Sequence, residues 1–409
     1  GMAVPPPRGT MGTPSAAAQR NSATTSSGAC ASATARGIQR RMPLPAAKRS
    51  RAATSVHQAP RNPDGPFPVA GPAATSSPMV AQRELLRRVS RTFALSLEIL
   101  PPPLRSWLGL GYLLLRVADT FEDSPTWPVR QRRWLLRRWH HALGPNGGDA
   151  APFVAAAAQL PAGSAEAALL DRTPSLLAEL RTLPPAAARV LRGAVRRTTR
   201  DMAFWLRRGP RFPTERWLDR YMHSVAGRVG YLVTDLFALV APAIARRRAE
   251  LRPLARQFGL GLQTVNVLRG LAADRERGWI YVPNSFAHAA GLEPAELFDP
   301  VHRAAALAVV DRLVAKAERH LAHALVYVER LPRRYARLRL ACVWPLLFAA
   351  GTLARCRGNP AVVDGEAKLD RAEVRRILRR SLPAAWSNAA VRHLYTALLH
   401  PGQKPTSSR

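Results

Sequence analysis

An acidic cluster inside an otherwise apolar segment is the first feature of this sequence that could carry chemistry. The polar positions fall on one side of a helix, because they recur at intervals of three and four residues: Tyr112, Arg116, Asp119 and Asp123, with Glu122 beside them. Carboxylates one turn apart repel one another and are costly to bury, and a hard divalent cation such as Mg²⁺ relieves both problems. The alternative is a solvated helix end, at which Glu122 and Asp123 simply close the helix.

A second polar stripe occurs later in the chain. Asn266, Gly270 and Asp274 repeat every four residues and therefore share one side of a helix, with Gln263 close to it. Amide and carboxylate oxygens are suitable ligands for Mg²⁺. Guanidinium groups bind phosphate, and three arginines lie nearby: Arg269, Arg275 and Arg277. Taken alone, these residues are more often caps or surface residues, so the stripe gains meaning only beside the first one.

A third segment combines a tyrosine with small residues. Tyr221 and Arg228 are seven residues apart and share a side, and Ala226, Gly227 and Gly230 form a small-residue face. That face either permits close approach of another helix or leaves room for a long apolar ligand. A buried tyrosine with a satisfied hydroxyl is the simpler interpretation of Tyr221.

From residue 80 onward the apolar periodicity is helical almost throughout, so we predict an all-α fold in one large domain. Only Trp279–Pro283 resembles a short strand. The predicted helices span residues 82–99, 104–122, 128–142, 165–181, 185–207, 214–240, 242–272, 301–329, 334–356, 370–380 and 387–399.

Composition limits the remaining choices. The chain has 409 residues, 47% of them hydrophobic, and a formal net charge of +34 that comes almost entirely from arginine. Part of that charge is typical of a GC-rich coding sequence; the rest would favour polyanionic partners such as anionic lipid or diphosphates, since no nucleic-acid-binding motif is present. Three cysteines form no disulfide framework, Cys342 lies in an apolar run, and no segment is a convincing membrane span. We expect a cytoplasmic protein, with peripheral contact to an anionic membrane as an option.

Residues 1–78 differ from the rest, being rich in Ala, Ser, Pro and Arg with a single acidic residue, Asp64. Such a segment buries too little apolar surface to offset its ordering entropy, so we expect disorder there and in the tail 401–409, around a helical domain over 79–400. Three interpretations of the first segment compete: an organelle leader, a basic tail that holds the protein near a membrane, and a misassigned start with translation from Met79. We favour the third.

Several of these motifs, in this order and spacing, resemble squalene and phytoene synthases. The resemblance covers residues 80 to about 385 and rests on Ser90-Arg91-Thr92-Phe93, the segments 112–123, 221–230 and 263–283, Cys342-Val-Trp-Pro345, Gly358-Asn-Pro and Lys368-Leu-Asp370. It implies an isoprenoid-synthase fold with a central cavity, in which two prenyl diphosphates bind and join head to head through a cyclopropyl intermediate. The form Asp-Thr-Phe-Glu-Asp is closer to squalene synthases.

The resemblance also implies roles for individual residues. Metal would be held by Asp119, Glu122, Asp123, Asn266 and Asp274, and diphosphate by Ser90, Arg91, Tyr112, Arg116, Arg228 and Arg269. Tyr221 resembles the family's catalytic tyrosine, acting with Asp119 and Asp123. The implied cofactors are Mg²⁺ and, if squalene is the product, NADPH, although no Rossmann-type glycine fingerprint is present.

Two departures from the family pattern keep alternatives open. Gly270 and Ala273 stand where the family has acidic residues, which removes metal ligands, and Ala341 stands where we expect an aromatic residue, which questions a reductive step. The alternatives are a phytoene-type synthase that uses geranylgeranyl diphosphate, and a catalytically weak or inactive basic binding protein of the same fold.

Overall fold

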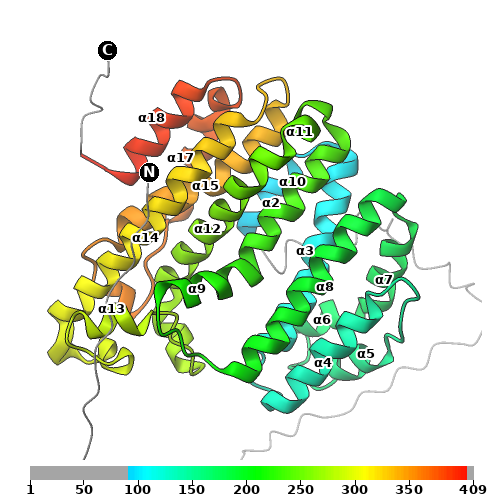
Figure 1. The fold of residues 1–409 in the computed structure, drawn as a ribbon, viewed down its shortest axis with the longest axis horizontal. Coiled ribbons are helices and arrows are strands. Elements are labelled where there is room, and N and C mark those ends of the chain that lie inside the picture. Colours follow the sequence, from blue (N-terminus) through cyan, green and yellow to red (C-terminus); the bar gives the residue numbers. More distant parts are fainter. Residues whose placement is uncertain (1–90, 403–409) are drawn as a thin grey trace, which may run out of the picture. The chain divides into compact units, whose positions relative to one another are not determined.

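The computed structural model describes residues 91–402, with side chains for residues 95–402. Every regular element in that range is a helix, which confirms the all-α prediction for the described part of the chain (Figure 1). The prediction of disorder in residues 1–78 and the first half of the helix predicted over 82–99 lie outside the described residues, while residues 91–98 are helical as predicted.

Along residues 91–402, α-helices of 4 to 29 residues follow one another. They are α2 (Arg91–Glu98), α3 (Pro102–Asp123), α4 (Val129–Ala142), α5 (Ala151–Ala157), α6 (Ala165–Asp171), α7 (Thr173–Thr182), α8 (Pro185–Arg208), α9 (Glu215–Met222), α10 (Arg228–Val240), α11 (Pro242–Arg246), α12 (Arg248–Glu276), α13 (Asn284–His288), α14 (Arg303–Arg330), α15 (Ala336–Cys356), α16 (Ala361–Asp364), α17 (Arg371–Ser381) and α18 (Asn388–Leu399). One π-helix, η1 (His223–Gly227), joins α9 to α10, and the 3₁₀ segments are η2 (Pro294–Phe298), η3 (Pro300–His302) and η4 (Leu382–Ala385).

Local sequence explains where the helices begin and end. Proline occupies the first turn of α3, where its missing N–H would have no helical partner in any case. At the start of α17, Asp370 accepts a hydrogen bond from the Glu373 amide at 2.8 Å, and Glu373 accepts one in return at 2.9 Å. Helix α8 ends at Gly209, whose φ of 79° disfavours residues with a side chain.

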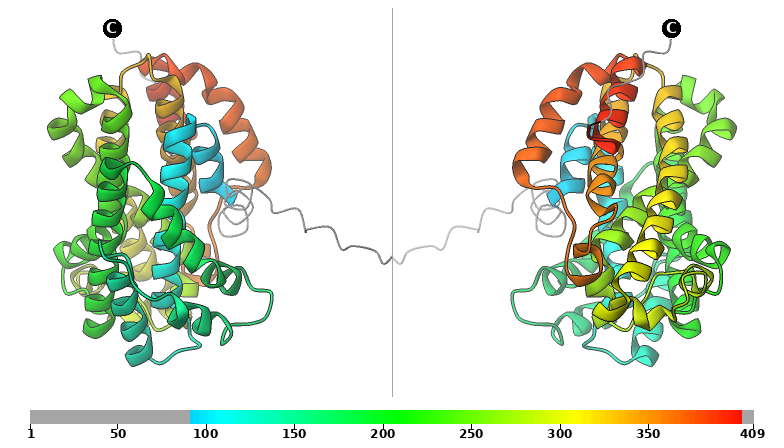
Figure 2. Two further views of the ribbon diagram at one scale, coloured as in Figure 1. Left: turned by 90° about the vertical axis from the view of Figure 1, so that its right-hand side faces the viewer. Right: turned by 90° about the vertical axis from the view of Figure 1, so that its left-hand side faces the viewer.

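Helix α12 is central to the packing, because it contacts α10, α14 and α15, while α3 packs on α4 and α8 (Figures 1 and 2). Glycines permit the closest of these approaches. A Cβ atom at Gly230 would overlap the Ala255 carbonyl, and one at Gly259 would overlap the Ala226 carbonyl. The small-residue face of segment 221–230 therefore does serve close helix packing.

The predicted helix over 214–240 is interrupted by the π-helix η1. The Thr198 hydroxyl donates to the Ser224 carbonyl at 3.2 Å, and the Ser224 hydroxyl donates to the Arg220 carbonyl at 3.0 Å. Side-chain donors thus satisfy backbone acceptors in this turn, where the regular ladder is interrupted. No apolar periodicity reports such contacts, which explains why the sequence suggested one continuous helix.

Other boundaries also differ from the prediction. The region 165–181 is divided into α6 and α7 at Arg172, just before Pro174, whose missing N–H cannot continue a helix. The region 242–272 is divided at Arg247, and the short helices α5 and α13 were not predicted. Residues 279–283, the one strand-like run, form no strand.

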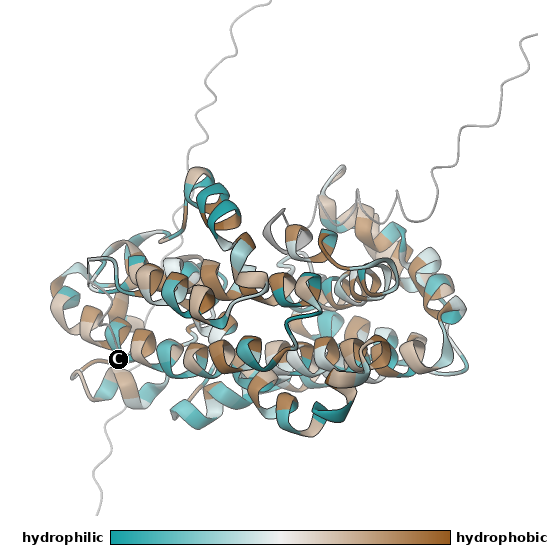
Figure 3. Cartoon of the chain, turned by 90° about the horizontal axis from the view of Figure 1, so that it is seen from above, coloured by the Kyte–Doolittle hydropathy of each residue, from teal (hydrophilic) through white to brown (hydrophobic). Residues whose placement is uncertain are grey.

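Helix α15 is the apolar core helix of the C-terminal half. It is the one described helix with the length and composition to cross a membrane, but 83% of its apolar window is buried inside the protein. Arg339 on this helix is fully buried and donates to the carbonyls of Val328, Leu331 and Ala385 at 2.6–2.8 Å. Colouring by hydropathy shows apolar and polar residues alternating along the helices (Figure 3).

Candidate active site

The polar stripe of α3 faces an internal cavity. Tyr112, Leu115 and Asp119 line that cavity, while Leu113 and Leu114 are buried on the other sides of the helix. Arg116 lies on the same stripe and contacts two carboxylates, Asp119 at 3.8 Å and Glu166 at 3.2 Å. Glu166 is on α6, so this arginine also ties α3 to a neighbouring helix.

The carboxyl groups of α3 are close enough to disturb one another. Burial, opposed by the charge of Arg116 and assisted by that of Asp123, raises the pKa of Asp119 to about 7. Burial, followed by the charges of Asp123 and Asp119, raises the pKa of Glu122 well above its usual range. The Oε1 atom of Glu122 is buried and has no hydrogen-bond partner among the described residues. The three carboxyl groups therefore lie close together in a setting that disfavours the charged forms of two of them, although Arg116, Arg132 and Arg277 oppose this effect.

The second stripe reaches the same region from α12. Asn266 and Gln263 line the cavity together with Asp119 of α3. Further along α12, the segment after its last turn brings Arg277 between the two acidic stripes, since its guanidinium lies 3.3 Å from Asp123 and also donates to Asp274. The carboxylates of both stripes are therefore near one another, bridged by a cation of the protein itself.

Gly270 lies between these residues and leaves open space. A Cβ atom there would meet only Asp274 Oδ2, at 3.8 Å. The other departure on this helix, Ala273, is exposed. The missing acidic residue at position 270 thus leaves a gap on the stripe that a larger side chain could occupy.

The cavity has a volume of about 320 Å³, at the lower end of typical small-molecule sites. Its walls are mainly apolar and come from α3, α8, η1, α10, α12, α14 and α15, with these lining residues: Leu108, Tyr112, Leu115, Asp119, Thr198, Val225, Ala226, Val229, Gly230, Leu232, Val233, Ala255, Phe258, Gly259, Leu262, Gln263, Asn266, Tyr327, Ala341, Cys342 and Pro345. The small-residue face of segment 221–230 therefore serves both purposes, close packing and space for an apolar ligand.

Two residues of the C-terminal motif form part of this wall. Cys342 is buried as predicted, and burial raises the pKa of its thiol to about 12, so it is a neutral apolar surface. Ala341, which stands where the family pattern has an aromatic residue, lines the same cavity. A small side chain at this position leaves the cavity wider than an aromatic ring would.

Tyr221 is buried next to the acidic cluster rather than on the cavity wall. Its hydroxyl donates to the Tyr281 hydroxyl at 3.1 Å, and its ring stacks on those of Tyr281 and Trp279. Burial, and then the nearby charge of Glu122, raise the pKa of Tyr221 well above its usual range. The hydroxyl therefore stays protonated and close to carboxylates.

The remaining predicted residues lie elsewhere. Arg228 pairs with Asp201 through its Nε at 3.1 Å and does not line the apolar cavity. Arg269 has its Nε 3.9 Å from Glu366 and is about half exposed. Ser90 and the side chain of Arg91 fall outside the described residues. His223 is partly buried, and its Nδ1 has no partner among the described residues.

The donor set fits Mg²⁺ bound together with phosphate rather than in a closed protein cage. Within residues 95–402, no group of three or more His, Cys, Asp or Glu side chains is arranged to hold a metal. The clustered carboxylates and the unpartnered Glu122 oxygen nevertheless offer hard oxygen donors. Mg²⁺ is commonly held by one or two carboxylates, with phosphate and water completing the octahedron.

Sequence reasoning missed several residues that the structure brings to this region. Tyr281 is the hydroxyl partner of Tyr221, Thr198 and Tyr327 line the cavity, and Glu166 pairs with Arg116. Tyr281 could have been noticed as the aromatic residue in the loop after the second stripe. The other three lie on separate helices with ordinary amphipathic patterns, so no local signal marks them.

The comparisons with known proteins agree with this arrangement. A family model for squalene/phytoene synthases matches residues 86–376. Botryococcus squalene synthase of Botryococcus braunii is 29% identical over 300 residues, covering 72% of this chain and 61% of that protein. The human squalene synthase is 24% identical over 339 residues, covering 82% of this chain and 77% of the relative. The chain spans about three fifths of the length of the first three curated relatives, at 61%, 59% and 63%.

Solved structures share the fold. A complex of TcSQS with the ligand BPH1237 superposes with a TM-score of 0.64 at 24% identity, covering 78% of this chain and 96% of that one. A dehydrosqualene synthase with ligand gives a TM-score of 0.52 at 16% identity, covering 75% and 95%. Together with the family match, these findings confirm the resemblance that the motifs indicated: the chain belongs to the squalene/phytoene synthase family.

Proposed function

We propose that this protein condenses two prenyl diphosphates head to head in a Mg²⁺-dependent reaction, with farnesyl diphosphate as the preferred substrate and squalene or a related C30 compound as the product. The observation that carries the proposal is the apolar cavity, whose lining includes Asp119 of α3 and Asn266 of α12. Such a space suits a hydrocarbon chain at one end and a diphosphate at the other. The family membership supports the same chemistry.

In this proposal the acidic residues hold metal, and the basic and phenolic ones orient diphosphate. The metal-holding set is Asp119, Glu122, Asp123, Asn266 and Asp274, and the diphosphate-contacting set is Ser90, Arg91, Tyr112, Arg116 and Arg269. Arg228, which the resemblance also implied, is left out of this set because it pairs with Asp201 and does not line the apolar cavity. Bound Mg²⁺ would supply positive charge to the leaving diphosphate, and Arg277, between Asp123 and Asp274, supplies protein charge at the same place.

The condensation releases one diphosphate and one proton for each C30 cyclopropyl diphosphate formed. The allylic carbon of one substrate loses its diphosphate and bonds to the double bond of the other, and loss of a proton closes the three-membered ring. The cavity walls exclude water from this cation, which would otherwise be captured as an alcohol. Squalene formation then requires a hydride and a second diphosphate release, for which NADPH is the proposed donor.

Tyr221 is proposed to take part in proton removal and in stabilising the cation. Its support is the buried hydroxyl, bonded to Tyr281 and close to Glu122. Because the phenol stays protonated, it would act through the Tyr281 hydroxyl pair, with a carboxylate as the final proton acceptor. The stacked rings of Trp279 and Tyr281 add electron-rich faces to the same region.

The direct test is a product assay. The protein is incubated with farnesyl diphosphate or geranylgeranyl diphosphate, with Mg²⁺ or with a chelator, and with or without NADPH. We expect Mg²⁺-dependent diphosphate release with farnesyl diphosphate, a cyclopropyl C30 diphosphate without NADPH, and squalene with it. A preference for geranylgeranyl diphosphate and a C40 product would replace the substrate assignment. Absence of diphosphate release under every metal condition would refute the enzymatic proposal.

A further inference from the structure

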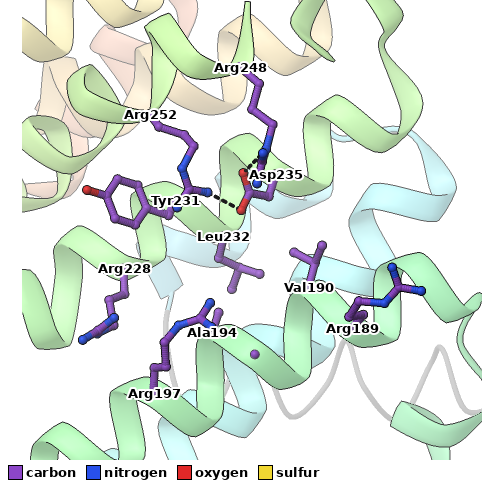
Figure 4. Close-up of a pocket in the computed structure, with 11 residues that line it drawn as sticks. Arg189, Val190, Ala194, Arg197, Arg228, Tyr231, Leu232, Asp235, Arg248 and Arg252 are labelled. Atoms are coloured by element: carbon purple, nitrogen blue, oxygen red, sulfur yellow. Dashed lines mark hydrogen bonds and ion pairs between the residues drawn. The ribbon is translucent and has the colours of Figure 1, made fainter. Parts of the chain in front are cut away.

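A second hollow lies between α8, α10 and α12 and is lined largely by arginine (Figure 4). Its volume is about 420 Å³, larger than that of the apolar cavity. The arginines come from all three helices: Arg189 and Arg197 from α8, Arg228 from α10, and Arg248 and Arg252 from α12. We call this hollow the arginine pocket.

Only part of this positive charge is compensated. Asp235 accepts hydrogen bonds from Arg248, at 2.7 Å, and from Arg252 (Figure 4). Arg228 is paired with Asp201 beside the pocket, at 3.1 Å from its Nε. Two carboxylates thus face five guanidinium groups, and Asp201 is also bound by Arg200, so at least three positive charges are in excess.

The two arginines of α8 are the ones without an ion-pair partner among the described residues. Within residues 95–402, neither Arg189 nor Arg197 makes an ion pair or a side-chain hydrogen bond. Figure 4 shows Arg197 extending from α8 toward α10. Burial, and then the charges of Arg228, Arg252 and Arg200, lower the pKa of Arg197, with Asp235 opposing, so this guanidinium lies mainly among like charges. Such an arrangement is unfavourable unless an anion joins it.

The form of the pocket suits a compact phosphate rather than a flat surface. Arginine side chains from three helices line one hollow, and guanidinium binds phosphate oxygens in bidentate pairs. The excess of three charges matches a diphosphate better than a singly charged anion. The volume lies within the usual range of small-molecule sites, about 300–1,000 Å³.

The pocket is separate from the apolar cavity but shares a wall with it. Leu232 of α10 lines both hollows, while Val229 and Val233 face the cavity and Tyr231 faces the pocket. The Arg252 guanidinium lies 4.2 Å from the centre of the Tyr231 ring, which holds both side chains at the pocket wall. Helix α10 therefore separates the apolar cavity from the arginine pocket.

We propose that the arginine pocket is a second anion site, which binds the diphosphate group of a small molecule independently of the acidic stripes. The group could belong to free inorganic diphosphate or to a nucleotide. Binding in this pocket needs no metal, because guanidinium groups supply all the positive charge. This inference concerns a site that the proposed condensation does not use.

The test measures binding without turnover. Inorganic diphosphate, and in a second arm ADP, is titrated by calorimetry into the full-length protein in a chelator, which removes metal-dependent binding at the acidic stripes. The pocket variant is Arg189→Gln with Arg197→Gln, two exposed side chains whose loss leaves the core intact. The matched control is Arg130→Gln with Arg312→Gln, also exposed and remote from the pocket lining.

We expect the wild-type protein, the control and Asp119→Asn to bind diphosphate equally, and the pocket variant to bind at least about tenfold more weakly. Binding of ADP that is lost in the same variant would identify a nucleotide source, and binding of inorganic diphosphate alone would identify the free anion. Equal binding by the pocket variant, equal displacement by sulfate at matched ionic strength, or no binding in the chelator would overturn the inference. None of these outcomes depends on turnover, so they are distinct from failure of the proposed function.

Discussion

At the scale of single residues, Asp119 unites the features that the proposed chemistry needs. Its side chain is 38% exposed, and it lines the cavity, while Arg116 lies 3.8 Å away. Its pKa is raised to about 7 because burial disfavours the charged form. A carboxyl whose pKa is raised in the folded state opposes folding at neutral pH, which favours our proposal that Asp119 serves to hold metal.

Replacing Asp119 tests whether its carboxylate serves metal binding or the stability of the fold. We expect Asp119→Asn to reduce Mg²⁺-dependent diphosphate release by about 100-fold or more, because an amide supplies no negative charge for the metal. The melting temperature should stay the same or rise, since an uncharged group replaces a partly buried carboxylate. Asp171→Asn, at an exposed position of α6, is the control and should leave both quantities unchanged. Retained turnover in Asp119→Asn would exclude the metal assignment.

Gly270 permits the opposite experiment, which adds a charge. The position has room for a side chain, with Asp274 Oδ2 as the only neighbour, at 3.8 Å. We expect Gly270→Asp to lower the Mg²⁺ concentration at half-maximal activity, because it restores an oxygen donor to the stripe. Stability should change by less than about 1 kcal/mol, since the gain in helix propensity opposes repulsion by Asp274.

The comparison variant is Gly270→Ala, which has a similar backbone effect and no carboxylate. Equal Mg²⁺ dependence in the two variants would show that the stripe does not bind metal at this position. Lost activity in Gly270→Asp alone would instead indicate a site adapted to glycine.

Sequence spacing could predict the stripes but not the partners. Asp119 and Asn266 were found because helical periodicity places them on one face of their own helix. The pairing of Arg228 with Asp201 joins α10 to α8, and the pairing of Arg269 with Glu366 joins α12 to a distant loop. Periodicity within one helix contains no information on the neighbour it will meet, so these arginines were assigned to diphosphate without knowledge of their ion pairs.

At the scale of elements, the contact of α10 with α12 depends on the absence of a side chain. A Cβ at Gly230 would overlap the backbone carbonyl of Ala255, which cannot rotate away as a side chain could. We expect Gly230→Ala to lower the free energy of unfolding by about 2 kcal/mol or more, because the helices must separate. Chemical denaturation measures the change.

The control for this prediction is Gly193→Ala on α8. Its Cβ would meet only the Arg197 guanidinium, at 3.4 Å, so the helix gains about 0.5–1 kcal/mol from the better propensity of alanine. A Gly230→Ala variant as stable as Gly193→Ala would contradict the close approach of the two helices.

His223, the first residue of the π-helix η1, makes the stability of the protein depend on pH. Burial, and then the charges of Arg228 and Arg256, lower the pKa of His223 to about 4, with Asp201 opposing. The unfolded chain takes up this proton near pH 6.5, so the contribution of His223 is present above that pH and is lost as the pH falls toward 4. We expect wild type to lose about 1 kcal/mol more than His223→Gln between about pH 7.5 and pH 5, by denaturation at each pH. Parallel pH profiles would contradict this.

At the scale of the whole molecule, the sequence predicted the class of fold well, because long amphipathic helices are recognisable from the helical spacing of their apolar residues. The bounds of α3, α8, α14 and α15 lie within about two residues of prediction. Periodicity could not predict the π-helix, or the apolar cavity and the arginine pocket on either side of α10. Both arise from contacts between distant segments, and the arginine pocket in particular needs three helices to meet.

The formal charge of +34 has a consequence for surfaces that the protein meets. We expect it to bind vesicles that contain phosphatidylserine at low salt and to release them at about 0.5 M NaCl, because screening shortens the reach of surface charge. Cosedimentation measures this, with neutral phosphatidylcholine vesicles as the control. Salt-resistant binding, or equal binding to neutral vesicles, would point to apolar insertion instead.

The π-helix η1 also fixes the angular setting of everything that follows it. Consecutive residues of an α-helix are turned by about 100°, so one residue removed from segment 223–227 would rotate α10 by roughly that amount relative to α9. Side chains of α10 that now line the apolar cavity would then face the arginine pocket, and Asp235 would lose its contacts with Arg248 and Arg252. The length of this five-residue segment, more than its composition, therefore determines which face of α10 lines the apolar cavity and which lines the arginine pocket.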